Sequence, residues 1–197
     1  MTRTSALPRI TRTRRCARLA DIVFNAFIAV IAFIACIGLP ARAALPAAYD
    51  AIVVSPVPQD GNRLEFDLRP ALAQARAKGK WLYVYLGASD CPYCRRYENF
   101  LAANAPALLP HFREKYLLVD LRSALDVTAP RMILRSDRHR LPYADFQRAI
   151  GDQRARLLVY PSVWLLDPDG QPLMQMPAGA GTFETVPEQL EILRLEN

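Results

Sequence analysis

Histidine and cysteine are scarce in this sequence, and their scarcity excludes most metal centres. The 197 residues include two histidines, His111 and His139, and four cysteines. A structural zinc site needs four such ligands, and the two histidines show no paired spacing. A covalent c-type haem needs a histidine directly after a C-x-x-C motif, where this chain has Arg95. We therefore expect no cofactor, with copper(I) held by two thiolates as the chemical alternative.

An excess of positive charge is missing from most of the chain. The formal net charge is +6, but seven of the 25 basic and one of the 19 acidic residues lie in residues 1–43, so the rest carries 18 of each. A nucleic-acid-binding domain gathers Lys and Arg on its folded surface, so we expect no nucleic-acid partner. The length and the 52% hydrophobic content suit one domain with a sizeable core.

Residues 1–43 have the pattern of an export leader. Six arginines precede the apolar run IVFNAFIAVIAFIACIGL (22–39), which ends at Pro40 and ARAA. This combination is typical of a secretory signal peptide, and we expect cleavage after Ala43. The run of 18 residues is long for a cleaved signal and just reaches the length of a membrane span. An uncleaved anchor in the inner membrane is the alternative, and both readings predict a periplasmic or otherwise exported domain.

Removal of the leader would leave Cys91 and Cys94 as the cysteines of the exported chain. Disulfides can form in such a compartment. A bridge across two residues closes so short a loop that it barely restricts the unfolded chain. A structural staple is therefore a poor explanation for SDCPYCRR (89–96), and a redox pair is a better one.

Hydrophobic periodicity predicts an α/β domain over residues 64–197, after a proline-rich extended lead-in at 44–63. The expected helices cover residues 68–79, 93–105, 143–155 and 186–195, and the expected strands cover 81–88, 116–121, 163–167 and 171–176. The sequence DPDG joins the last two strands as a hairpin. Residues 122–142 lack periodicity and read as a loop or insertion. This alternation favours a central, partly parallel sheet with an antiparallel edge hairpin.

The two cysteines lie where a buried strand gives way to a helix. Pro92 suits the first helical turn, and Cys91 before it would meet unpaired N–H groups and the positive end of the helix dipole, which favour a thiolate. The thiolate is the form that attacks disulfides. Cys94, one turn further in, would be shielded and close enough to displace a mixed disulfide. We expect a solvent-reachable Cys91 to attack and Cys94 to resolve.

These residues resemble the thioredoxin superfamily over about residues 64–195. Besides C-P-Y-C, the second signature is VYPSVWLLDPDGQPL (159–173), because superfamily members carry a cis-proline before a strand and hairpin, packed against the active-site cysteines. Pro161 matches that position. The resemblance implies a thioredoxin-like fold, with a central mixed sheet flanked by helices, and a substrate groove lined by Tyr160, Pro161, Pro92 and Tyr93.

Within the superfamily, residues 66–98 are similar to an exported branch that includes the C-terminal domain of the transmembrane reductase DsbD and SoxW-type periplasmic thioredoxins. Glu98 matches a glutamate of the DsbD-like pattern, where it would help proton transfer to or from Cys94. Two residues depart from the superfamily. Tyr85 stands where a buried acid is frequent, and Asp90 replaces a frequent tryptophan with a charge that would oppose a thiolate.

The resemblance implies an exported protein thiol–disulfide oxidoreductase that reduces protein disulfides, with a membrane thiol reductase as electron donor and the oxidative direction open. The 70 positions from Cys91 to Pro161 exceed the usual interval, and residues 122–142 supply the excess as an insertion before the cis-proline unit. The alternative is a binding module whose dithiol holds copper(I), or whose groove docks a partner without turnover. A membrane would be a partner only if the leader is retained.

Overall fold

The computed structural model describes residues 44–152, 157–177 and 183–194. The expected leader lies outside these residues. None of the helices within them is long and apolar enough to cross a membrane.

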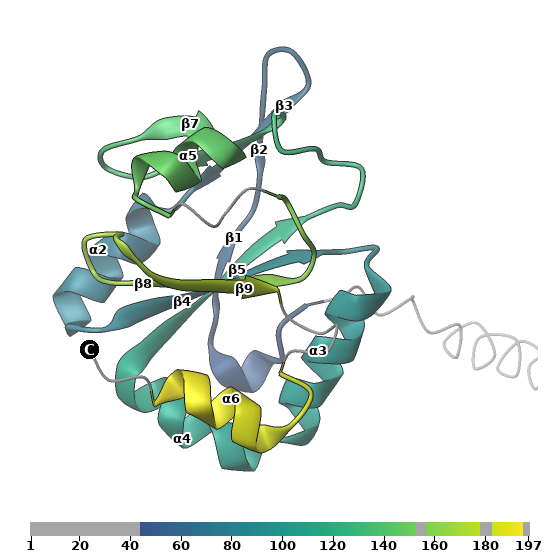
Figure 1. Cartoon of the computed structure of the whole chain (residues 1–197), viewed down its shortest axis with the longest axis vertical. Helices are drawn as coiled ribbons and strands as arrows, with labels where there is room; N and C mark the ends of the chain where they lie inside the picture. The colour runs from purple at the N-terminus through teal and green to yellow at the C-terminus, as the bar shows by residue number, and fades with distance from the viewer. Residues whose placement is uncertain (1–43, 153–156, 178–182, 195–197) are drawn as a thin grey trace, which may run out of the picture. The chain divides into compact units, whose positions relative to one another are not determined.

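Five strands form the central mixed sheet in the order β1-β5-β4-β8-β9 (Figure 1). They are β1 (Ile52–Val54), β4 (Trp81–Ala88), β5 (Tyr116–Ser123), β8 (Ser162–Leu166) and β9 (Pro172–Pro177). β5 pairs in parallel with β1 and β4, whereas β8 pairs antiparallel with β4 and β9. The predicted partly parallel sheet with an antiparallel edge hairpin is confirmed.

Helices cover both faces of this sheet (Figure 1). They are α2 (Arg69–Lys78), α3 (Pro92–Ala103), α4 (Ala105–Lys115), α5 (Tyr143–Ala149) and α6 (Val186–Leu193). Residues of α2 and α5 join one apolar cluster, and residues of α3, α4 and α6 join the other. The layered α/β architecture is therefore the predicted thioredoxin-like one.

Strand β4 separates the two clusters. Successive side chains of a strand point to opposite faces, so Leu82, Val84 and Leu86 enter the first cluster while Tyr83 and Tyr85 enter the second. All five are fully buried. The prediction of a strand buried on both faces is confirmed, and it places Tyr85 on the side of the sheet that carries α3.

A second sheet corrects the prediction that residues 122–142 form a loop. Its order is β2-β3-β6-β7, from β2 (Val57–Gln59), β3 (Arg63–Asp67), β6 (Met132–Arg135) and β7 (Arg140–Pro142). The hairpin β6–β7 lies in the expected loop, and β6 pairs in parallel with β3. Buried Glu65 of β3 accepts hydrogen bonds from Arg135 and Arg140 at 3.2 and 2.7 Å. Arg135 and Arg140, which lie in the expected loop, therefore connect β6 and β7 to Glu65 of β3.

Three further segments differ from the sequence-based expectation. The lead-in at 44–63 contributes β1, β2 and a short helical turn, η1 (Ala47–Tyr49). Helix α4 was not expected, because it contains prolines. Helix α5 ends at Ala149, and Gly151 after it has a φ of 95°, so the helix expected over 143–155 is shorter. Residues 153–155 lie outside the described part of the chain.

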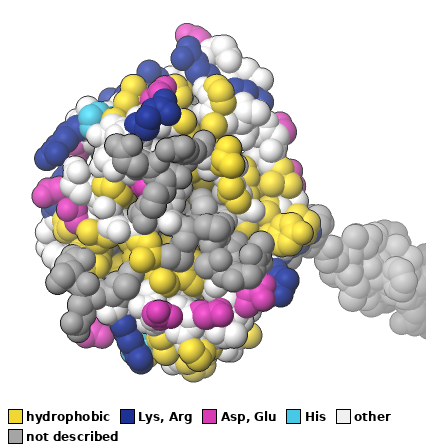
Figure 2. Space-filling model, viewed as in Figure 1, with side chains coloured by type: hydrophobic (Ala, Val, Ile, Leu, Met, Phe, Trp, Pro, Cys, Tyr) yellow, Lys and Arg dark blue, Asp and Glu magenta, His cyan; other side chains and the backbone are white. Residues whose placement is uncertain are grey.

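Both charge signs share the surface. On the face drawn in Figure 2, basic and acidic side chains are interspersed around the rim, with apolar side chains between them.

Candidate active site

Cys91 is the N-cap residue of α3. The backbone N–H of Cys94 donates to the Cys91 sulfur at 3.1 Å, as the N–H groups of a first helical turn do to a capping side chain. Strand β4 ends at Ala88, so the sulfur lies at the junction of strand and helix. The expected start of a helix at the motif is confirmed, and the sulfur accepts an N–H at the positive end of the helix dipole.

The cis-proline segment at Tyr160–Pro161 lies against the sulfur of Cys91. The Tyr160–Pro161 peptide bond is cis, and the Cys91 thiol donates toward the Tyr160 carbonyl oxygen over 3.9 Å. Pro161 is buried and Tyr160 is half-buried. The Tyr160 hydroxyl donates to Ser123 Oγ at 3.1 Å, at the end of β5. The structure thus brings together Cys91 and the cis-proline segment, as the sequence predicted.

The exposure of Cys91 differs from the expectation. Both cysteines are free thiols, yet Cys91 is 1% exposed and Cys94 is fully buried. Between them Pro92 is exposed, and Tyr93 is 55% exposed. The expectation of a directly reachable Cys91 sulfur is therefore wrong for this conformation. The exposed residues of the motif are therefore Pro92 and Tyr93, and its two sulfurs are buried.

Asp90 ties the cysteine loop to the chain after β5. Its Oδ1 accepts the backbone N–H of Leu125 at 2.9 Å, and the Ser89 N–H donates to the Ser123 carbonyl at 2.9 Å. The residue that replaces the frequent tryptophan thus serves as a loop anchor.

A buried polar network lies behind the cysteines. Glu98 Oε1 accepts hydrogen bonds from Arg122 Nη1 at 2.8 Å and from the Tyr85 hydroxyl at 3.0 Å. Arg122 Nη2 donates to Asp120 Oδ2 at 2.7 Å. The Arg122 side chain is 14% exposed, and those of Glu98 and Asp120 are 5% and 4% exposed. Glu98 is therefore a paired, buried carboxylate rather than a solvent-facing helix acid.

Cys94 lies against this network. Its sulfur accepts the Ala88 N–H at 3.4 Å, and its carbonyl oxygen lies 3.5 Å from the Tyr85 hydroxyl oxygen. Burial raises the pKa of Cys94 to about 12 and nearby Cys91 adds to the shift, whereas the Ala88 N–H and the Tyr85 hydroxyl oppose it. Burial therefore favours the thiol form of Cys94 over the thiolate.

Gly87 makes the network possible. A Cβ atom at this position would lie 2.6 Å from Tyr85 Cε1 and 2.8 Å from Arg122 Nη1. Sequence reasoning missed Gly87, Asp120 and Arg122. Asp120 and Arg122 are two residues apart in β5 and therefore share one of its faces, but the expected strand ended at residue 121 and left Arg122 in the expected loop.

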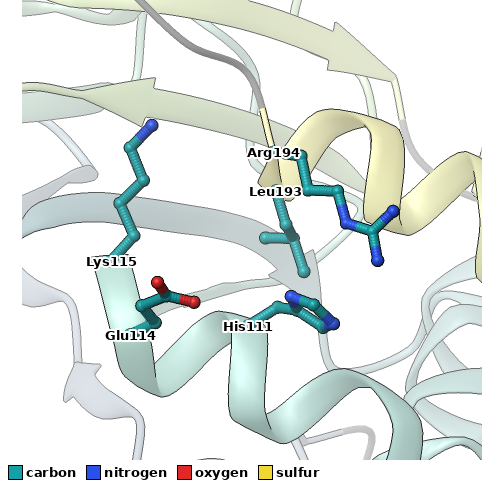
Figure 3. A pocket seen from close by; sticks show the side chains of 5 residues that line it. All are labelled: His111, Glu114, Lys115, Leu193 and Arg194. Carbon is teal, nitrogen blue, oxygen red and sulfur yellow. The ribbon is translucent and has the colours of Figure 1, made fainter.

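A separate surface pocket of about 390 Å³ lies between α4 and α6. Figure 3 shows the lining residues His111 and Glu114 of α4, Leu193 of α6 and Arg194, which directly follows α6. This pocket contains none of the site residues predicted from the sequence.

The described part of the chain holds no group of three or more His, Cys, Asp or Glu side chains placed to bind a metal ion.

Comparison of the chain with known protein families identifies the family to which it belongs. A sequence model of a thioredoxin-like domain matches residues 68–192, which is more than half of the chain. The chain belongs to this family. The matched thioredoxin-like domain runs from the start of α2 into α6, and so contains both cysteines, the second-sheet hairpin and Pro161. The superfamily expectation is confirmed, while the DsbD- and SoxW-like branch stays a prediction.

Two solved structures are similar to the thioredoxin-like domain at low identity. The exposed lipoprotein thioredoxin Etrx1 of Streptococcus pneumoniae is 15% identical, with a TM-score of 0.36, over 62% of this chain and 87% of that one. A thioredoxin-fold protein from Helicobacter pylori is 13% identical, with a TM-score of 0.34, over 74% of this chain and 89% of that one. A comparison with curated protein sequences finds no match.

Proposed function

We propose that this protein is an exported thiol–disulfide oxidoreductase that reduces disulfides in other proteins. The supporting observation is the position of the Cys91 sulfur, which accepts the Cys94 N–H at the start of α3 and lies against the Tyr160 carbonyl beside cis-Pro161. A thioredoxin-like fold alone carries many functions. The site rather than the fold is therefore the basis of the proposal.

The reaction uses the two sulfurs in turn. The Cys91 thiolate attacks a substrate disulfide, forms a mixed disulfide and releases the first substrate sulfur as a thiolate. Deprotonated Cys94 then attacks the Cys91 sulfur, which closes the Cys91–Cys94 disulfide and releases the second substrate sulfur. The substrate gains two electrons and the protein loses two. A membrane thiol reductase of the same compartment would restore the dithiol.

The residues around Cys91 suit a polypeptide substrate. Tyr93 is exposed between the cysteines, and Tyr160 and Pro161 lie beside the sulfur. With Pro92, these residues would line the groove that receives the substrate chain. The predicted leader supports export, and the similarity of residues 66–98 to the DsbD- and SoxW-like branch supports the reductive direction.

Reduction of insulin by dithiothreitol tests the proposal. The wild-type protein should accelerate the reaction, the Cys91→Ser variant should match the uncatalysed rate, and the Cys94→Ser variant should lose turnover because the mixed disulfide accumulates. A Cys91→Ser variant with full activity would refute the assigned nucleophile. A wild-type protein that exchanges no disulfide but retains copper(I) at one ion per dithiol would support the binding module instead.

The reduction potential of the dithiol tests the direction. Equilibration with a glutathione buffer should give a potential below that of the glutathione couple if the protein is a reductant. A potential well above it would assign the protein to the oxidants.

A further inference from the structure

We propose that Tyr85 relays a proton from Cys94 to Glu98 while Arg122 holds Glu98 in place. This inference rests on the proposed thiol–disulfide exchange and names the residues that activate its second thiol. It also gives a role to the tyrosine that stands where related domains often have a buried acid.

The Tyr85 hydroxyl lies between the donor and the acceptor of this proton. It donates to Glu98 Oε1 at 3.0 Å, and it lies 3.5 Å from the Cys94 carbonyl oxygen. Tyr85 and Cys94 belong to one buried cluster, and hydrogen bonding by Tyr85 lowers the pKa of the Cys94 thiol. A phenol has one proton and two lone pairs. When Tyr85 gives its proton to Glu98, a lone pair is therefore left for the Cys94 thiol proton.

Arg122 fixes the proton acceptor. Its Nη1 binds the same Glu98 oxygen that Tyr85 binds, and its Nη2 binds Asp120. Asp120 Oδ2 also accepts the Leu45 N–H at 3.4 Å. The Arg122 guanidinium lies 5.5 Å from the centre of the Tyr85 ring. The guanidinium thus fixes the Glu98 oxygen that faces the phenol, so Arg122 is a positioning residue.

Glu98 is the acceptor that the surroundings of Cys94 favour. The ionisable groups that interact with Cys94 or Tyr85 include Cys91, Glu98 and Arg122, and Arg122 in turn binds Asp120. Two of them are carboxylates. Asp120 binds the far nitrogen of Arg122, whereas Glu98 accepts directly from Tyr85. The short path from Cys94 to a carboxylate therefore runs through the tyrosine.

Two protons move together in this step, and the net result is the transfer of one proton from Cys94 to Glu98. In the mixed disulfide, the Cys94 S–H proton passes to the Tyr85 oxygen while the Tyr85 O–H proton passes to Glu98 Oε1. The Cys94 thiolate attacks the Cys91 sulfur, and the Cys91–substrate bond breaks. The leaving thiolate takes a proton from solvent, and Glu98 later returns its proton to solvent.

A chromogenic aromatic disulfide separates this step from the first one. Each thiolate it releases absorbs light, so the first equivalent reports attack by Cys91 and the second reports resolution by Cys94. We expect the Tyr85→Phe variant to keep the first rate within about twofold. Its second rate should fall about 10²-fold at pH 7, the lower range for loss of a general base, and the deficit should shrink as pH rises and hydroxide replaces the relay.

Tyr83→Phe is the matched control. Tyr83 lies on the same strand and its buried hydroxyl is 2.6 Å from that of Tyr97, on a separate hydrogen-bond network. This variant loses a comparable buried hydroxyl and should keep both rates. Glu98→Gln should reproduce the slow second step of Tyr85→Phe, and the double variant should be no slower than either single variant. Glu98→Gln also provides the test if Tyr85→Phe does not fold.

The outcomes separate this inference from the proposed function. A wild-type protein that releases no first equivalent contradicts disulfide exchange itself. If the wild type releases thiolate in two phases, disulfide exchange takes place. If the Tyr85→Phe variant then has the same second-phase rate and the same pH profile as the wild type, the relay is overturned and the oxidoreductase proposal stands. Equal slowing by Tyr83→Phe would likewise overturn the relay, because it would show a general loss of buried hydrogen bonding.

Discussion

The Arg122→Leu substitution measures what holds the buried network together. Arg122 binds Glu98 at 2.8 Å and Asp120 at 2.7 Å, and both carboxylates are at least 95% buried. Breaking a buried ion pair by removing one partner costs about 3–5 kcal/mol, because the other charge stays buried without compensation. Here one substitution strands two carboxylates. We therefore expect the free energy of unfolding to fall by about 5 kcal/mol at pH 7, a large part of the ~5–15 kcal/mol typical of a domain.

Equilibrium unfolding in urea measures the free energy of unfolding of the wild type and of the variant. The two values can be compared if the m-values are the same. Arg76→Leu is the control, since Arg76 and Asp137 form a 2.9 Å pair whose side chains are 41% and 48% exposed. Such a surface pair contributes about 0–1 kcal/mol. An Arg122→Leu loss no larger than that of Arg76→Leu would refute the reasoning.

Three other perturbations follow from the structure. The added Cβ of Gly87→Ala would meet Tyr85 and Arg122. The substitution should therefore destabilise the fold by about 1–3 kcal/mol through overpacking, which urea unfolding measures. It should also reduce the rate at which the second thiolate is released in the aromatic-disulfide assay. Thr185→Ala should cost about 1 kcal/mol, because it removes the capping box that starts α6, and should leave exchange rates unchanged. Burial alone would raise the pKa of Glu65, but hydrogen bonds and charges of Arg140 and Arg135 outweigh it and lower the pKa below 4.5. The Glu65 pairs therefore stabilise the fold above the ordinary pKa and lose this effect as pH falls through the lowered value; the stability advantage of the wild type over Glu65→Gln should shrink between pH 7 and pH 3.

The elements that sequence reasoning recovered are those with strong local patterns. Each of them can be recognised from a few neighbouring residues: the eight-residue apolar run of β4, the proline at the start of α3 and the Asp-Gly turn before β9. The hairpin β6–β7 could not be predicted from the sequence, because its strands are short. The buried acid that its arginines bind, Glu65, lies about 70 residues earlier in the chain. Helix α4 was hidden by Pro106 and Pro110. Pro106 lies in the first turn, where its missing N–H has no helical partner.

The candidate site divides in the same way. Cys91, Cys94 and Pro161 follow from motifs that the sequence displays directly. Tyr85 looked like a departure from the superfamily, since its significance depends on Glu98 in α3 and Arg122 in β5, which meet it only in the folded chain. The burial of Cys91 could not be predicted either, because it depends on the cluster of residues from several elements to which Cys91 belongs in the folded chain.

Covalent trapping tests the assigned chemistry most directly. A Cys94→Ser variant, produced in an exporting host and isolated with its thiols blocked, should carry substrate proteins in mixed disulfides at Cys91 that dithiothreitol releases and peptide mass spectrometry locates. The variant with both cysteines replaced by serine should carry none. A Cys94→Ser protein without adducts, or a Cys91→Ser protein that accumulates them at Cys94, would contradict the assignment of Cys91 as the attacking sulfur.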